Sequence, residues 1–132
     1  MAEFAIAVTI FFLVLMALVD FGRAVFAYNG VSEAAREIAR TTSVHPGAQT
    51  LGTSPETAQT VATQLRLVPG MAATPTFACV DLSGTAYGSG HQCLSGVDFV
   101  QVTVAASWTP ATPLLGLIGP LNLTSSSTIR LS

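Results

Sequence analysis

Two cysteines and two histidines are the side chains of this 132-residue sequence best suited to chemistry. Cys79 and Cys93 stand fourteen positions apart and adjoin a glycine- and serine-rich loop, residues 83–96. In an oxidising compartment this spacing favours a structural disulfide. The alternatives are two free buried thiols, or a metal site that adds His91. Such a site would offer three ligands at most and lacks paired C-x-x-C geometry, so no metal is expected.

Enzyme motifs are absent: the sequence has no G-x-S-x-G, Walker loop, H-E-x-x-H or Rossmann glycine pattern. His45 precedes Pro46 in an expected loop and His91 lies in the glycine-rich loop, and either imidazole could act as a general base. Neither has a nucleophile or carboxylate constellation nearby in sequence, so we interpret both as solvated loop residues. The sequence predicts no enzyme, no catalytic residue and no cofactor. A membrane-anchored hydrolase that uses His45 or His91 is the rival interpretation.

Composition excludes several classes of protein. Half of the residues are hydrophobic and 9% are charged, against roughly 25% charged residues in a typical soluble domain. Lysine is absent and the five arginines are scattered, which argues against nucleic-acid binding. The high hydrophobicity excludes a disordered chain. The apolar excess must therefore lie in a membrane, in an oligomer interface, or in both.

One apolar segment accounts for this excess. Residues 4–19 form a run of sixteen without a charge, in which Thr9 is the only polar side chain. As a helix the run would be about 24 Å long, slightly shorter than the roughly 30 Å hydrocarbon core of a bilayer. It is apolar on all sides, which excludes an isolated surface helix. Three interpretations remain: a secretory signal peptide, an ordinary single-span anchor, or a helix that lies first in a membrane and later in a protein bundle.

Glu3 favours the third interpretation. An ionisable side chain at the tip of an apolar helix is costly in lipid and usually has a partner. Glu3 could instead lie in the headgroup region, or be stabilised by the positive end of the helix dipole. The signal-peptide interpretation is weakened because the region before the run is acidic, and because residues 20–23 follow the run in place of a small-residue cleavage site.

The helix is predicted to continue from residue 3 to residue 44, a length of roughly 60 Å. Apolar side chains recur at spacings of three and four across residues 20–44, and they keep their phase through the turn signal Asn29-Gly30. Three i,i+3 pairs of opposite charge support the helix: Asp20 with Arg23, Glu33 with Arg36, and Glu37 with Arg40. Such a helix is too long for so small a core. Residues 4–19 must therefore project as a membrane or filament-core segment, while residues 20–44 pack on a head formed by residues 45–132.

The head is expected to combine one short helix with a small sheet. Ser54 as N-cap and Pro55 at the first helical position start the helix, which residues 68–70 end. Strands are predicted at residues 76–82, 97–108, and between 121 and 131. The predicted fold class is α+β and pilin-like: a long N-terminal α-helix and a small globular head with a short second helix and a small antiparallel β-sheet.

The apolar residues of the head follow two patterns. The strand at 97–108 alternates, and its apolar face consists of Val100, Val102, Val104, Ala106 and Trp108. An apolar loop punctuated by proline and glycine separates this strand from the last one. Its large side chains either cap the core or contact a neighbouring subunit: Leu114, Leu115, Leu117 and Ile118.

An ordered set of motifs along residues 3–40 resembles one known family. Glu3-Phe4-Ala5 and the apolar run are followed by Val19-Asp20-Phe21-Gly22-Arg23, then Tyr28-Asn29, Ala34-Ala35-Arg36-Glu37 and Ala39-Arg40. In this order and spacing they are similar to the N-terminal half of TadE-like pilins, in the Tad (Flp) branch of the type IV pilus superfamily. Beyond residue 45 the sequence is similar to the family in style only.

The resemblance implies that the subunit lies first in the cytoplasmic membrane and later in an extracellular filament. A prepilin peptidase cuts such precursors after a glycine in a short leader, and the apolar helix then holds the subunit in the cytoplasmic membrane with its head outside. Inner-membrane assembly machinery, driven by a cytoplasmic ATPase, extracts the subunit into an extracellular filament at the cell surface. The expected partners are therefore the lipid bilayer before assembly, this machinery, and then other copies or related pilins.

These observations predict a role for each candidate residue. The family's glutamate would be Glu3, which directs docking by pairing with a cation in the dry bundle; the N-terminal amine of a neighbouring subunit is the candidate. The filament core would consist of Phe4, Ile6, Val8, Ile10, Phe11, Phe12, Leu13, Leu15 and Leu18. The family motif that follows comprises Asp20, Phe21, Gly22, Arg23, Arg36 and Arg40.

The predicted function is that of a structural pilin-like subunit. It would assemble through its apolar helix into a type IV or Tad-like filament used for surface attachment or cell contact. The alternatives are a membrane-anchored extracytoplasmic receptor or scaffold, and a secretion-system pseudopilin that forms no long filament.

Overall fold

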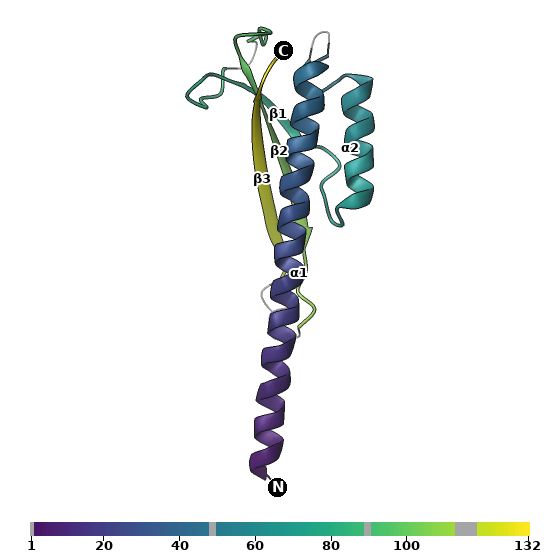
Figure 1. The fold of residues 1–132 in the computed structure, drawn as a ribbon, viewed down its shortest axis with the longest axis vertical. Coiled ribbons are helices and arrows are strands. Elements are labelled where there is room, and N and C mark those ends of the chain that lie inside the picture. The colour runs from purple at the N-terminus through teal and green to yellow at the C-terminus, as the bar shows by residue number, and fades with distance from the viewer. Residues whose placement is uncertain (1, 48–49, 89–90, 113–118) are drawn as a thin grey trace.

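The computed structural model describes residues 2–47, 50–88, 91–112 and 119–132 (Figure 1). Two helices, α1 (Ala2–Val44) and α2 (Pro55–Leu67), precede three strands, β1 (Thr76–Val80), β2 (Phe99–Trp108) and β3 (Leu121–Arg130). The strands form one antiparallel sheet in the order β1-β2-β3. The predicted α+β class, with one long helix, one short helix and a small antiparallel sheet, is confirmed.

Helix α1 runs without a break for 43 residues, through the turn signal Asn29-Gly30. A Cβ placed on Gly30 would lie 3.5 Å from the side chain of Val68, which is ordinary contact. The position therefore tolerates a helical backbone, and the packing of the next turns on the head outweighs the low helix propensity of Asn and Gly. The helix ends at Val44, before Pro46, as the sequence predicts.

The core lies between the second half of α1 and the sheet. The α1 side chains that face the sheet are fully buried and mostly small: Val31, Ala34, Ala35, Ile38 and Ala39. From the sheet, the alternating apolar residues of β2 complete the same cluster: Val100, Val102, Val104 and Ala106. Trp108 belongs to this face by alternation but is only partly buried, because β2 ends there.

Helix α2 starts as the sequence predicts. The Ser54 hydroxyl accepts a hydrogen bond from the backbone N–H of Thr57 at 3.2 Å, and Pro55 occupies the first turn. The buried Thr57 hydroxyl also lies 3.4 Å from that of Thr42 on α1. Both ends of this contact have further hydrogen-bond partners, so a polar pair joins the two helices without leaving a buried group unsatisfied.

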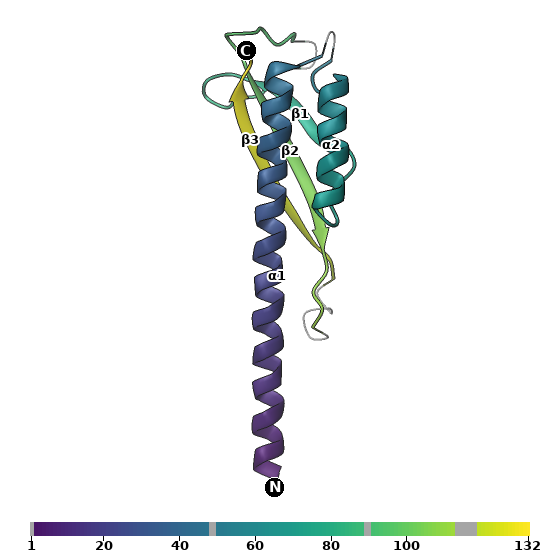
Figure 2. The same ribbon diagram turned by 45° about the vertical axis from the view of Figure 1, so that its right-hand side comes forward.

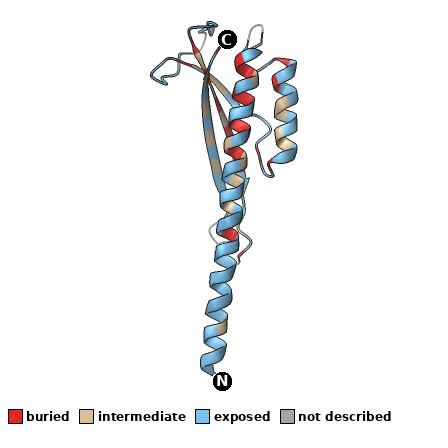
Figure 3. Cartoon of the chain, in the orientation of Figure 1, coloured by how far each residue is buried: buried red, intermediate tan, exposed pale blue. Residues whose placement is uncertain are grey.

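The first half of α1 extends well beyond the head, and both views show it as a bare helical rod (Figures 1 and 2). Colouring by burial makes the same division, with buried residues concentrated where α1 meets the sheet and α2 (Figure 3). We call residues 4–19 the stem. Between the stem and Val31 the helix buries Asp20 alone, whereas Phe21 and Tyr28 on the predicted apolar stripe are exposed. The loop leucines and Ile118, at 114–118, lie outside the described residues.

Replacement of Ile38 by alanine tests the core. Ile38 is fully buried against the sheet, and an Ile→Ala change at such a site costs about 2–5 kcal/mol of unfolding free energy. Urea denaturation of the full chain in detergent micelles, followed by near-UV circular dichroism, measures the loss. Val44→Ala, on the same helix but 57% exposed, should change the unfolding free energy by less than about 0.5 kcal/mol. Equal losses for both variants would contradict this assignment of the core.

Candidate assembly interface: the stem and its junction with the head

The stem leaves its large apolar side chains uncovered within the chain. Phe4 is 76% exposed and Leu18 is 62% exposed. Among the predicted filament-core residues Val8 is half-buried, and the others are exposed: Phe4, Ile6, Ile10, Phe11, Phe12, Leu13, Leu15 and Leu18. By its length and composition, helix α1 is long and apolar enough to cross a membrane. This is a surface that lipid or other protein must cover, since large apolar side chains are worth ~1.5–3 kcal/mol each when removed from water.

Glu3 lies in the first turn of α1 and is exposed. Within the described part of the chain it belongs to none of the three ion pairs, which join Asp20 with Arg23, Glu33 with Arg36, and Asp98 with His91. Its carboxylate is the only ionisable side chain between residues 2 and 19. The tip of the stem therefore offers an apolar surface that carries a single negative charge.

Asp20, at the end of the stem, is the residue that joins α1 to a distant part of the head. Its carboxylate is 2% exposed and accepts hydrogen bonds from the Thr112 hydroxyl at 2.5 Å, the Thr112 N–H at 2.8 Å and the Ala111 N–H at 3.1 Å. Arg23 donates a fourth, at 3.2 Å. The segment that follows β2 is thereby held on α1. The sequence predicts only the Arg23 contact, because nothing in it pairs residue 20 with residues 111–112.

The remaining residues of the predicted family motif differ in their surroundings. Phe21 is 69% exposed, and a Cβ placed on Gly22 would meet no atom of the described residues within 4 Å. Arg36 lies 3.9 Å from Glu33, and both side chains are largely exposed. The predicted pair between Glu37 and Arg40 is absent among the described residues. Both of its members are exposed, where an ion pair gains little in water and restricts two long side chains.

A second group of polar residues lies at the opposite end of the sheet, near the C-terminus. A disulfide joins Cys79 to Cys93, with Cα atoms 5.9 Å apart. Beside it, the buried Asp98 carboxylate lies 3.0 Å from His91 Nε2 and accepts the Leu94 N–H at 2.8 Å. The Leu94 amide first, and the imidazole second, hold the pKa of Asp98 below its ordinary value. Partial burial and the negative charge of Asp98 raise the pKa of Tyr87, whose ring stacks on His91.

This group of residues changes the expectation that His91 has no carboxylate partner, and it bears on the alternative of a metal site. His91 does have a carboxylate partner, because the fold closes the loop so that Asp98, seven residues on, reaches the imidazole. Among the described residues, Cys79, His91 and Asp98 are also the one set whose ligand atoms lie close enough for a metal ion. With the Cys79 sulfur in a disulfide, however, only His91 and Asp98 retain ligand atoms, which is fewer than a structural metal site uses.

Loss of the Asp20 carboxylate should release the segment after β2. In an Asp20→Ala variant we expect amide hydrogen exchange at Ala111 and Thr112 to rise by at least about tenfold, because both amides lose their acceptor. Thr112→Val should give a smaller increase, since it removes the hydroxyl donor and keeps both amide bonds. Exchange measured by NMR on the full chain in micelles distinguishes these outcomes. Unchanged protection in Asp20→Ala would exclude the anchoring role.

The Asp98 cluster should make the head sensitive to acid. A carboxylate whose folded-state pKa is lowered stabilises the fold fully above its unfolded-state pKa of about 3.9, and this contribution disappears as the pH falls through the folded-state value. The melting temperature of the wild type should therefore approach that of Asp98→Asn as the pH is lowered from 5 to 2.5. A gap between the two that stays constant over this range would contradict the assignment.

Comparison with known protein families gives a match for about the first third of the chain. Residues 1–40 match the family model described as TadE-like protein. No curated protein and no solved structure matches the chain significantly. The match covers the stem, Asp20, the neighbouring Phe21-Gly22-Arg23 and most of the part of α1 that packs on the head. The N-terminal segment of this chain, residues 1–40, is therefore similar to that of TadE-like proteins.

Proposed function

We propose that this chain is a structural pilin-like subunit. It assembles through the stem into an extracellular type IV or Tad-like filament, used for surface attachment or contact between cells. The observation that carries the proposal is the stem itself, in which eight of the predicted core side chains are exposed on a helix that projects from a folded head. The TadE-like match over the same residues supports it.

The stem is suited to two environments in turn. In the cytoplasmic membrane, lipid tails cover its apolar sides, and the head lies on the outer face. In a filament, neighbouring stems replace the lipid without exposing the apolar side chains to water. Each large side chain kept from water contributes ~1.5–3 kcal/mol, and this gain must exceed the entropy lost on association. Prepilin peptidase and inner-membrane assembly machinery are the partners that this route requires.

Glu3 gives the assembly its selectivity. An unpaired carboxylate in a dry bundle costs several kcal/mol, so only arrangements that bring a cation to Glu3 are stable. An apolar stem alone would pack in many axial positions with similar energy. A single charged group near its tip penalises all but one of them.

The rest of the chain plays a structural part in this proposal. The head surrounds a core of small and β-branched residues, and the disulfide closes the loop at its outer end. The sulfur beside the His91–Asp98 pair, Cys79 Sγ at 3.9 Å from Asp98, is held in the disulfide and is not a free thiolate nucleophile. We therefore assign no reaction to the protein, and no cofactor.

Substitution of Glu3 tests the docking role. Glu3→Ala and Glu3→Gln should leave the subunit in the membrane, because the stem stays apolar, but reduce its amount in sheared cell-surface material by at least about tenfold. Immunoblots of the membrane and sheared fractions measure both pools. The matched control is Glu33→Ala, which removes an exposed glutamate from the same helix and should give normal yield.

Two outcomes would contradict the proposal in different ways. A normal sheared yield from both Glu3 variants would exclude the docking role. Wild-type protein found only in the membrane fraction would exclude the filament and favour the membrane-anchored receptor or scaffold, or a pseudopilin.

A further inference from the structure

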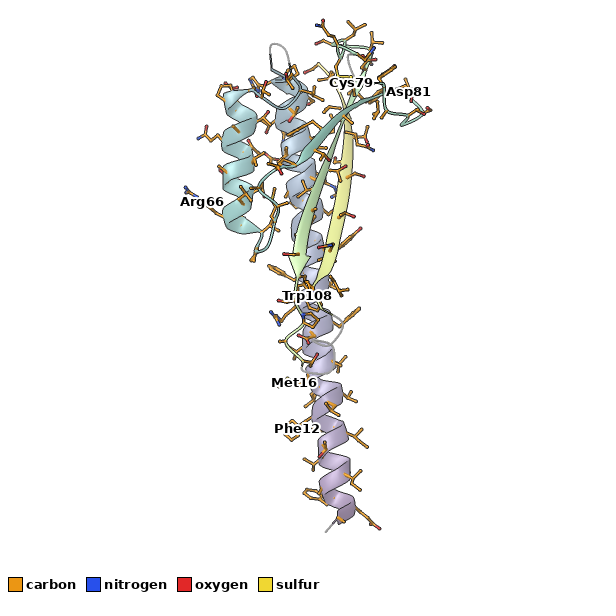
Figure 4. The ribbon with its side chains drawn as sticks, turned by 180° about the vertical axis from the view of Figure 1, so that it is seen from behind. Phe12, Met16, Arg66, Cys79, Asp81 and Trp108 are labelled. Carbon is orange, nitrogen blue, oxygen red and sulfur yellow. A yellow bond between two sulfur atoms is a disulfide. The ribbon has the colours of Figure 1, made fainter. Side chains whose placement is uncertain are left out.

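A shallow groove of about 390 Å³ lies where the stem meets the head. One side is formed by successive turns of α1, and the other by the end of the sheet and the turn after α2. Its lining residues are Val19, Gly22, Arg23, Phe26, Ala27, Pro69 and Trp108. Figure 4 shows Trp108 against α1 at this junction, above Met16 and Phe12 of the stem.

The walls of the groove are apolar and uncovered in the described structure. Phe26 is 75% exposed and Val19 is 59% exposed. A Cβ placed on Gly22 would meet nothing within 4 Å, so the glycine leaves a gap in the surface of α1. Val19, Gly22 and Phe26 follow the three- and four-residue spacing of one helix face. This face can therefore accept another helix at close range.

Arg23 is the one charged side chain among the described residues that line the groove, and Asp20 is its one hydrogen-bond partner among them. Its side chain is 52% exposed, and one nitrogen lies 3.2 Å from Asp20. Asp20 does not depend on this contact, because its two oxygens already accept three hydrogen bonds from Ala111 and Thr112. A guanidinium has five N–H donors, so Arg23 can bind a second carboxylate with two parallel hydrogen bonds.

The complementary surface is present on the same chain. Glu3 directly precedes the apolar stem, and no other side chain between residue 2 and Asp20 is ionisable. Glu3 and Arg23 lie 20 positions apart on one continuous helix, a rise of roughly 30 Å. They cannot meet within one subunit. They can meet between two parallel copies that are displaced by this distance along the helix axis.

We propose that the groove receives the tip of α1 from a second copy of this chain, with Glu3 of that copy bound to Arg23. The inference rests on the proposed function and names the cation that Glu3 requires. The pair fixes an axial displacement of roughly 30 Å between the two stems. Other displacements leave the Glu3 carboxylate unpaired against apolar surface, which is unfavourable.

Charge exchange in the full chain tests the pair. Glu3→Arg and Arg23→Glu should each lower the yield of sheared filaments by at least about tenfold, and the double variant should recover to within about threefold of wild type. Arg66→Glu, at an exposed arginine of α2 outside the groove, should have no effect. Hydrogen exchange at Ala111 and Thr112 shows whether Arg23→Glu leaves the Asp20 anchor intact.

A cross-link tests the register without changing any charge. Two parallel helices that bring residue 3 beside residue 23 also bring residue 7 beside residue 27, one turn further along each. A chain with Ala7→Cys and Ala27→Cys should therefore form oxidised multimers in sheared filaments. Neither single variant can form more than a dimer, and the pair Ala7→Cys with Ala17→Cys, which is ten positions out of register, should form no ladder. The native cysteines are already joined to each other.

The two hypotheses fail in different ways. The groove contact would be excluded, and the filament retained, by three results together. The wild type forms normal filaments, the Ala7→Cys and Ala27→Cys chain forms no cross-link, and charge exchange gives no rescue. A complete lack of wild-type filaments would overturn the proposed function as well. Should Arg23 bind a lipid phosphate instead, Arg23→Gln would weaken membrane retention and filaments would lack the cross-link, which also overturns the proposal.

Discussion

Removal of the stem from water is the constraint on which the remainder of this molecule depends. Residues 4–19 carry no charge, and α1 presents their side chains on every side of a single helix. The head does not cover them, since no residue of α1 before Asp20 is buried. Stability of the head and cover for the stem are thus separate problems. The first is solved within the chain, and the second requires lipid or further protein.

The junction between these two parts is built from polar contacts rather than from apolar packing. Asp20 is the only buried residue between the stem and Val31, and it holds the segment after β2 through its oxygens. The contact also has a consequence for Arg23. Since backbone and hydroxyl donors already satisfy Asp20, the guanidinium stays available at the edge of an apolar groove. The Asp20 carboxylate thus orders the boundary, and it leaves Arg23 free for the contact with a second subunit that we propose.

Much of the fold was predictable because its signals are local. The three- and four-residue spacing of apolar side chains predicted the extent of α1, and the N-cap Ser54 predicted the start of α2. The alternation of Val100, Val102 and Val104 predicted the central strand. The continuity of α1 through Gly30 was also predictable, because the apolar stripe kept its phase there.

The contacts that could not be predicted join residues far apart in sequence. No local pattern links Asp20 to Thr112, which is 92 positions away. The His91–Asp98 pair depends on a loop closure that spacing alone does not specify. Trp108 followed the alternation but lies at the end of β2, so it lines the junction instead of the core. The composition of the stem predicted that it needs cover, whereas the groove is lined by residues of α1, the turn after α2 and β2 that are far apart in sequence.

A reconstruction by cryo-electron microscopy of sheared cell-surface material, with this chain traced in it, would show what covers the stem. We expect filaments in which the stems pack against one another along the axis without intervening lipid, while the heads face solvent. A full-length chain that remains a monomer of 13.6 kDa in detergent-free buffer, its stem folded back onto a closed globule, would contradict this expectation.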